Sequence, residues 1–160
     1  MNPQKTLKTS DLQIVERPAM TVVGMLYHGP GMSPEIPQLW DKFGPRMESI
    51  EGSTNPMVSY GICANMDMQT GMFDYLAAVE VQEDAPTPAE MERWDIPGGL
   101  HAMIPAKLTT IGDAYQLAEQ LIPDAGYART GTLDYELYDE RFDPADPESV
   151  LYICIPVDKK

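Results

Sequence analysis

Basic residues, histidines and cysteines are all scarce in this chain, and each shortage narrows what the protein can do. There are 11 Lys and Arg against 25 Asp and Glu, which gives a formal net charge of −14. A field of this sign repels phosphate backbones, so we expect no direct nucleic-acid binding. The two histidines and two cysteines form no CxxC or other metal-ligand pattern. We therefore expect no metal and no other cofactor, and we expect both cysteines to be reduced core thiols.

Long apolar runs and familiar catalytic motifs are also missing. No apolar run approaches the roughly 18–20 residues that span a bilayer. Residues 1–10 lack the apolar segment of a signal peptide, so a cytoplasmic protein without membrane contact is the default expectation. The sequence contains no G-x-S-x-G motif and no phosphate-binding loop. It therefore gives no direct sign of an enzyme.

Enough apolar sequence is present for one packed domain. Apolar residues make up 43% of the 160 residues, which favours a globular body over disorder. Proline and glycine divide this sequence into segments whose periodicity alternates between strand and helix. The expected strands cover residues 12–16, 20–27, 57–64, 71–81, 100–107, 130–139 and 150–157.

Two helices are expected between these strands. The first begins at Ser33, a good N-cap residue followed by a proline, and Gly44-Pro45 should interrupt it before residue 50. The second runs from about Thr110 to Leu121, with Asp113 placed to complete a capping box. Residues 82–92, acidic and proline-containing, separate the two halves of the chain.

The order of elements repeats, since each half reads β-α-β-β. We therefore predict an α+β fold of duplicated β-α-β-β units, with two helices on one face of an antiparallel sheet and a ligand cleft between the halves. Residues 12–158 would form a single domain with pseudo-repeats at about 12–81 and 94–158. Residues 1–11 would be a loose N-terminal segment.

One strand carries an unusual carboxylate. In residues 132–139, Tyr135 and Leu137 alternate with Asp134, Glu136 and Tyr138. If Tyr135 and Leu137 pack under the helices, Glu136 and Tyr138 point to the opposite, cleft-like face. Glu136 is then a solvated strand carboxylate, a carboxylate paired with Arg129 or Arg141, or a buried anion that awaits a cation.

Several motifs in a fixed order resemble a known family. They are Arg17-Pro18-Ala19 with Val22-Val23-Gly24, Ile36-x-x-Leu39-Trp40-x-x-Phe43, Tyr60-Gly61-Ile62, the run 73–81, Trp94-x-Ile96-Pro97, Tyr135-Glu136-Leu137-Tyr138-Asp139 and Ile153-x-Ile155-Pro156. Across residues 12–158 the chain resembles the GyrI-like, or effector-binding, small-molecule domain family. A stand-alone copy such as this is most similar to the cationic drug-binding modules of integron cassettes.

The resemblance implies a pocket between the halves, in which a glutamate at the position of Glu136 pairs with cationic, lipophilic ligands. Aromatic side chains add cation–π attraction of roughly 0.5–2 kcal/mol each. Five aromatic residues complete the expected ligand site with Glu136: Tyr138, Tyr152, Tyr60, Tyr75 and Trp94. Tyr152 in particular is expected to point to the same face as Glu136.

Three functions remain open at this point. The first is a binding module for lipophilic cationic or amphipathic small molecules, anchored by Glu136. The second is a hydrolase of electrophilic small molecules with Glu136 as general base. The third is a protein-interaction module, as in gyrase inhibition by relatives. Ligand identity and oligomeric state, including a homodimer, stay open, as does regulation of a DNA-binding partner.

Overall fold

The computed structural model describes residues 12–31, 33–55, 57–131 and 133–160. It contains two α-helices and a nine-stranded antiparallel sheet, so the predicted α+β class is confirmed. The prediction of a loose segment at residues 1–11 lies outside the described residues. No helix in the described part of the chain is long and apolar enough to cross a membrane.

The elements follow the predicted order with small changes at their ends. The first half contains β1 (Gln13–Arg17), β2 (Met20–Pro30), α1 (Glu35–Phe43), the 3-10 helix η2 (Gly44–Ser49), β3 (Ser59–Ala64) and β4 (Met72–Val81). The second half contains β5 (Glu92–Ile96), β6 (Gly99–Ala106), the 3-10 turn η3 (Leu108–Thr110), α2 (Ile111–Asp124), β7 (Tyr127–Arg129), β8 (Asp134–Tyr138) and β9 (Leu151–Lys159). The short strands β5 and β7 were not predicted from the sequence.

The helix ends show where local sequence signals succeed. At Gly44-Pro45 the α-helix passes into a 3-10 helix, which confirms the predicted interruption. At the second helix the predicted capping box is wrong, because Thr110 makes no side-chain cap there. Its hydroxyl accepts a hydrogen bond from the backbone N–H of Lys107 in the preceding 3-10 turn instead.

The sheet order is β1-β6-β9-β8-β3-β4-β2-β5, with β7 added beside β9. Exchanging the two halves (β1 with β5, β2 with β6, β3 with β8, β4 with β9) reverses this order and leaves it otherwise unchanged. Strands β3 and β8 therefore lie at the centre, where the two halves meet. Each end strand pairs with a strand of the other half, β1 with β6 and β5 with β2.

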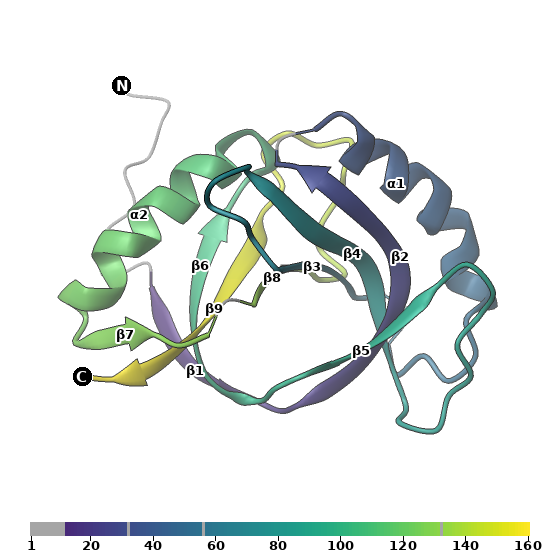
Figure 1. Ribbon diagram of the computed structural model, residues 1–160, viewed down its shortest axis with the longest axis horizontal. Helices are drawn as coiled ribbons and strands as arrows, with labels where there is room; N and C mark the ends of the chain where they lie inside the picture. The colour runs from purple at the N-terminus through teal and green to yellow at the C-terminus, as the bar shows by residue number, and fades with distance from the viewer. Residues whose placement is uncertain (1–11, 32, 56, 132) are drawn as a thin grey trace.

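Both helices lie on the outer side of the strongly curved sheet (Figure 1). α1 covers β2 and β4 through Leu39, Trp40 and Phe43. α2 covers β6 and β9 through Ala114, Ala118 and Ile122. A third cluster fills the inner, helix-free side, and it includes Tyr60, Ile62, Leu76, Tyr135, Leu137 and Cys154.

The inner cluster corrects the predicted orientation of β8. Tyr135, 2% exposed, and Leu137 do not pack under the helices but fill the inner side. Because side chains alternate along a strand, Glu136 points to the outer, helix-bearing side. The reason is that the inner side of the curved sheet is itself an apolar core, with Tyr60 packed edge-on against Tyr135. Alternation alone cannot tell which of two buried faces the helices cover.

Candidate functional site

Glu136 occupies the middle of the sheet, at the junction of the two halves. In β8 it stands opposite Gly61 of β3 on one side and Ile153 of β9 on the other. Its side chain is only 8% exposed. A carboxylate in this position has lost most of its hydration, so its hydrogen-bond partners decide whether it carries a charge.

Two tyrosine hydroxyls donate hydrogen bonds to the carboxylate of Glu136. The hydroxyl of Tyr75 in β4 donates to Glu136 Oε1 at 2.7 Å, and the hydroxyl of Tyr138 donates to the same oxygen at 2.6 Å. In α1, Trp40 Nε1 donates to the Tyr75 hydroxyl at 3.0 Å. Among the described residues, no hydrogen bond is made to Oε2. One oxygen is therefore held by a chain of aromatic donors, and the other is left for a further partner.

Aromatic rings surround this hydrogen-bond chain. The ring of Tyr138 packs edge-on against Trp40, with centroids 5.5 Å apart, and against Phe142, with centroids 4.8 Å apart. Trp40 also packs edge-on against Phe43, with centroids 5.9 Å apart. The carboxylate thus lies in an apolar, aromatic environment built from α1, β4, β8 and the loop after β8.

Gly61 makes room for the tyrosine–glutamate pair. A Cβ atom at this position would lie 2.2 Å from the Tyr75 hydroxyl and 2.6 Å from Glu136 Oε1. Both contacts are far shorter than a carbon–oxygen van der Waals distance. The absence of a side chain on β3 therefore lets the hydroxyl of Tyr75 reach across the strand to β8.

Burial raises the pKa of Glu136 from its ordinary value of 4.5 to about 7. The hydrogen bonds from Tyr138 and Tyr75 favour the charged form and limit the rise, whereas the charge of Asp134 adds to it. Burial, followed by the nearby Glu136 charge, also raises the pKa of both tyrosines well above 10.0. Both hydroxyls therefore remain protonated donors, and Glu136 is the group that titrates near neutrality.

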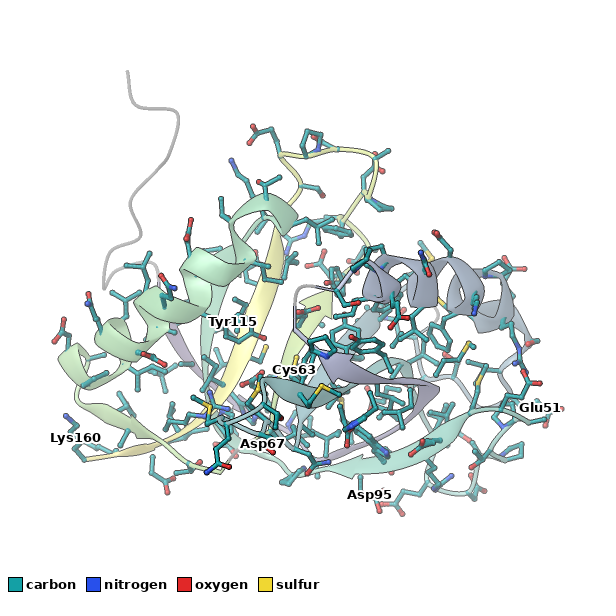
Figure 2. The ribbon with its side chains drawn as sticks, turned by 45° about the horizontal axis from the view of Figure 1, so that its top comes forward. Glu51, Cys63, Asp67, Asp95, Tyr115 and Lys160 are labelled. Atoms are coloured by element: carbon teal, nitrogen blue, oxygen red, sulfur yellow. The ribbon has the colours of Figure 1, made fainter. Side chains whose placement is uncertain are left out.

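Asp134, a second buried carboxylate on the same face of β8, forms an ion pair with Arg129. Asp134 Oδ2 pairs with Arg129 Nη2 at 2.6 Å, and the Tyr115 hydroxyl of α2 donates to Asp134 Oδ1 at 3.2 Å. Cys63 Sγ lies 3.9 Å from the same hydroxyl, and Figure 2 shows Cys63 and Tyr115 beside each other. Burial, with the charges of Glu136 and Asp134, raises the pKa of the Cys63 thiol well above 9.0, so it remains protonated.

Glu136 differs from Asp134 in having no such cation. Arg129 pairs with Asp134 and Arg141 pairs with Asp139, so neither arginine considered from the sequence is its partner. Within the described ranges, no Lys, Arg or His lies within ion-pair distance of Glu136. The described residues also contain no cluster of His, Cys, Asp or Glu that could hold a metal ion.

The structure brings together three of the six residues expected at the site, namely Glu136, Tyr75 and Tyr138. The other three, Tyr60, Tyr152 and Trp94, pack with the inner cluster on the opposite side of the sheet. The expectation that Tyr152 points to the same face as Glu136 is wrong. Tyr152 stands opposite Leu137 in the β8–β9 pair and therefore shares the inner side with it.

The six site residues expected from the sequence include none of Trp40, Tyr115, Phe142 and Gly61. Trp40 belongs to the apolar stripe of α1. Its indole N–H donates to Tyr75 only because α1 packs over β4, a contact that the sequence pattern does not contain. The one local signal was Gly61, a residue without a side chain between Tyr60 and Ile62 in β3. Such a glycine is typical of a close approach by another group.

The chain folds into two matched halves that meet at β3 and β8, beside Glu136. Residues 13–157 match the family of integron-associated effector binding proteins. The chain belongs to this family, as its resemblance to GyrI-like domains implied.

Individual relatives agree with this assignment. The chain is 39% identical over 155 residues to the transcriptional regulator BrlR of Pseudomonas aeruginosa, covering 94% of this chain and 57% of BrlR. Its fold is similar to the EcmrR C-terminal domain, with a TM-score of 0.73, 18% identity, and coverage of 93% of this chain and 98% of that domain. It is also similar to SAV2435 bound to tetraphenylphosphonium, with a TM-score of 0.68, 14% identity, and coverage of 92% and 93%.

BrlR and the EcmrR chain bound to DNA are both longer than the matched domain. The chain spans 57% of the length of BrlR and the same share of EcmrR in a complex with DNA. The charge argument against direct nucleic-acid binding therefore concerns this domain alone and stays a prediction. The property that the description of the family names is effector binding.

Proposed function

We propose that this domain binds lipophilic cationic small molecules and that Glu136 is their charge partner. The observation that carries the proposal is a buried carboxylate without a positive partner. Glu136 Oε1 accepts hydrogen bonds from two tyrosine hydroxyls, and no cationic side chain of the described residues pairs with Glu136. Such a group costs the fold free energy that a bound cation would recover.

The hydrogen-bond geometry favours a bulky organic cation over a metal ion. Both donors approach Oε1, so a ligand has a single carboxylate oxygen, Oε2, available to it. The surrounding groups are the rings of Trp40, Tyr138 and Phe142, whose faces attract a diffuse positive charge. A metal ion would instead require several oxygen ligands around it. Tetraphenylphosphonium, the ligand of SAV2435, has the required charge and apolar surface.

The proposal is tested by calorimetric titration of the full chain with tetraphenylphosphonium at about pH 8, where a carboxyl with a pKa of about 7 is ionised. Triphenylphosphine oxide, which is neutral and carries similar rings, serves as the ligand control. We expect saturable binding of the cation and at least about tenfold weaker binding of the neutral compound, since removal of a buried charge partner typically costs several kcal/mol.

Two variants separate the anchor from general electrostatics. Glu136→Gln keeps the size of the side chain and should weaken tetraphenylphosphonium binding by at least about tenfold. Asp134→Asn removes a carboxylate on the same face of β8 that already has Arg129 as partner, and it should change affinity by less than about threefold. Equal affinity of the wild type and Glu136→Gln would refute the role of Glu136, and equal loss in both variants would show a general charge effect.

A pKa of about 7 also suits a general base, which keeps hydrolysis of an electrophilic ligand as a second candidate function. In that case Glu136 Oε2 would accept a proton from a water molecule, while Tyr75 and Tyr138 hold Oε1. Turnover of an ester and epoxide panel by the wild type, lost in Glu136→Gln, would support hydrolysis. Recovery of every compound unchanged would leave binding as the function.

A further inference from the structure

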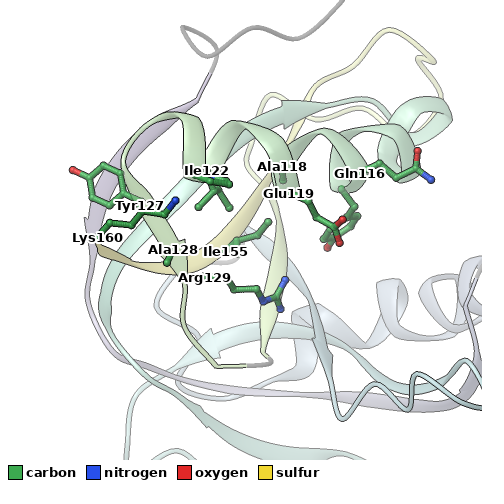
Figure 3. Close-up of a pocket in the computed structure, with 11 residues that line it drawn as sticks. Gln116, Ala118, Glu119, Ile122, Tyr127, Ala128, Arg129, Ile155 and Lys160 are labelled. Atoms are coloured by element: carbon green, nitrogen blue, oxygen red, sulfur yellow. The ribbon is translucent and has the colours of Figure 1, made fainter.

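The carboxylate of Glu136 is covered by protein in this structure. Glu136 and the two tyrosines that donate to it, Tyr75 and Tyr138, are each less than a tenth exposed. Figure 3 shows a cavity of about 460 Å³ between α2 and the β7–β9 pair, with Ala118 and Ile155 in its wall, but its lining includes none of those three residues. A bulky cation can therefore reach Oε2 only after a covering group has moved aside.

The loop between β8 and β9, residues 139–150, supplies one covering group. The ring of Phe142 packs edge-on against Tyr138, with centroids 4.8 Å apart, and lies against the apolar cluster under α2. In the ribbon views this loop, coloured yellow, lies between the near ends of α2 and α1 (Figure 1, Figure 2). From Glu140 to Glu148, Phe142 is the one residue that is not exposed. The loop thus packs on the site through a single aromatic ring.

Most polar contacts of this loop are made within the loop itself. Three of its backbone N–H groups donate to carbonyl oxygens three residues earlier in the loop, at Phe142, Asp146 and Ser149. The side chain of Arg141 pairs with Asp139, again inside the loop. Within the described ranges, two exposed polar contacts join the loop to its surroundings, from Arg141 to the Tyr152 hydroxyl and from Glu148 to Lys107. Such a loop can move as a unit while few contacts are lost.

The other walls of the site are held more firmly. β8 pairs with β3 and β9, and β4 pairs with β3 and β2, so the two strands that carry the tyrosine donors are each held on both sides. α1 is anchored on the sheet by Phe43, which is fully buried and packs against Trp40. The loop is therefore the part of the cover that opens at the lowest free-energy cost.

We propose that residues 139–150 form a lid, held closed by Phe142, which opens to admit a ligand to Glu136 and closes again on it. This inference rests on the proposed function, since it concerns access to the same carboxylate. Opening breaks the ring contact between Phe142 and Tyr138, and closing places the Phe142 ring against the bound cation. An aromatic pair of this kind favours the closed state about three- to tenfold.

The test is stopped-flow measurement of tetraphenylphosphonium binding to the full chain, which gives the association and dissociation rate constants separately. Phe142→Ala should raise the association rate constant about three- to tenfold, because the lid no longer has to open, and should raise the dissociation rate constant by at least as much. A ring that only lined a permanently open site would affect dissociation alone. An association rate constant of Phe142→Ala at or below the wild-type value would therefore overturn the proposal.

Two matched variants show whether the ring contact is responsible. Phe142→Leu keeps an apolar side chain without the aromatic ring and should raise both rate constants by less than Phe142→Ala does. Val150→Ala is also an apolar truncation in the loop, at an exposed position, and should leave both rate constants within about twofold of the wild type. Equal effects of Phe142→Ala and Val150→Ala would overturn the role of the ring.

A charge exchange tests movement of the whole loop with Phe142 left in place. Lys107→Glu turns the ion pair with Glu148 into a repulsion and should raise the association rate constant about two- to threefold above that of Lys159→Glu, which makes the same change of net charge in β9. Combining Lys107→Glu with Glu148→Lys restores an ion pair and should return the rate constant to within about twofold of the wild type. Equal rate constants for Lys107→Glu and Lys159→Glu would overturn the loop as the moving part.

A measurement without ligand separates the lid from the choice of ligand. Loss of the ring contact lets water reach the carboxylate, so Phe142→Ala should lower the pKa of Glu136 from about 7 toward its ordinary value of 4.5 in a carboxyl ¹³C NMR titration. A lowered pKa without tetraphenylphosphonium binding would support the lid and refute the proposed ligand. Tetraphenylphosphonium binding with wild-type rate constants and an unchanged pKa would support the ligand and refute the lid.

Discussion

Replacing Glu136 by Gln should make the protein more stable at alkaline pH. In the folded protein the pKa of Glu136 is about 7, against an ordinary value of 4.5 for a glutamate in water. Between pH 4.5 and about 7, the folded protein therefore keeps a proton on Glu136 that the unfolded chain has already released. The contribution of protonated Glu136 to the free energy of unfolding is fully present below about pH 4.5 and is lost as the pH rises through about 7.

The magnitude follows from the same two values. At about 1.36 kcal/mol for each tenfold change in the ionisation equilibrium, the interval from 4.5 to about 7 corresponds to about 3 kcal/mol. Gln keeps an acceptor for the hydroxyls of Tyr75 and Tyr138 and carries no charge at any pH. We therefore expect Glu136→Gln to exceed the wild type by about 2–3 kcal/mol near pH 8, and by little near pH 4.5.

Urea denaturation of both proteins at half-unit steps between about pH 4.5 and 9 measures this difference. Asp134→Asn is the matched control, because the pKa of Asp134 is raised by burial but pulled back by Arg129. Asp134→Asn removes only the smaller, like-charge contribution to the raised pKa of Glu136, so its stability relative to the wild type should rise much less than that of Glu136→Gln in the same alkaline window. A difference between Glu136→Gln and the wild type that stays constant with pH would refute the reasoning, as would a less stable variant near pH 8.

Two further predictions concern the groups around the carboxylate. Tyr75→Phe and Tyr138→Phe each remove a hydrogen bond that favours ionised Glu136, so each should raise the pKa of Glu136 further, by about one unit or more. Carboxyl ¹³C NMR titration measures this pKa. An unchanged pKa would contradict the hydrogen-bond geometry. Gly61→Ala should destabilise the fold by about 1–3 kcal/mol in urea, because its Cβ would meet Tyr75 and Glu136. Gly112→Ala, where a Cβ meets nothing within 4 Å, is the control and should be neutral or stabilising.

The sequence predicts the fold class and the element order because the signals involved are local. Alternation, proline and glycine mark β2, β4 and both helices, and Gly44-Pro45 interrupts α1 as expected. The strand β5 was missed because its sequence, Glu92–Ile96, alternates weakly and follows an acidic segment. Its pairing with β2 of the other half is a long-range feature that no local pattern contains.

The site was only partly predictable for a related reason. The period of two places Glu136 and Tyr138 on one face, and this held. It does not say which face the helices cover, because both sides of this sheet are apolar and buried. For that reason Tyr60 and Tyr152 were expected beside Glu136 and lie instead on the inner side. The contact of Trp40 with Tyr75 depends on the packing of α1, which is a tertiary property.

The most direct test of the account is the number of protons released when tetraphenylphosphonium binds. Calorimetry in two buffers of different ionisation enthalpy gives this number at each pH. If a cation binds the ionised form of Glu136, release should approach one proton near pH 6, fall to about half a proton near pH 7, and vanish near pH 9, as expected for a pKa of about 7. Glu136→Gln should release none. Binding by the wild type without proton release at any pH would contradict the claim that Glu136 is the charge partner.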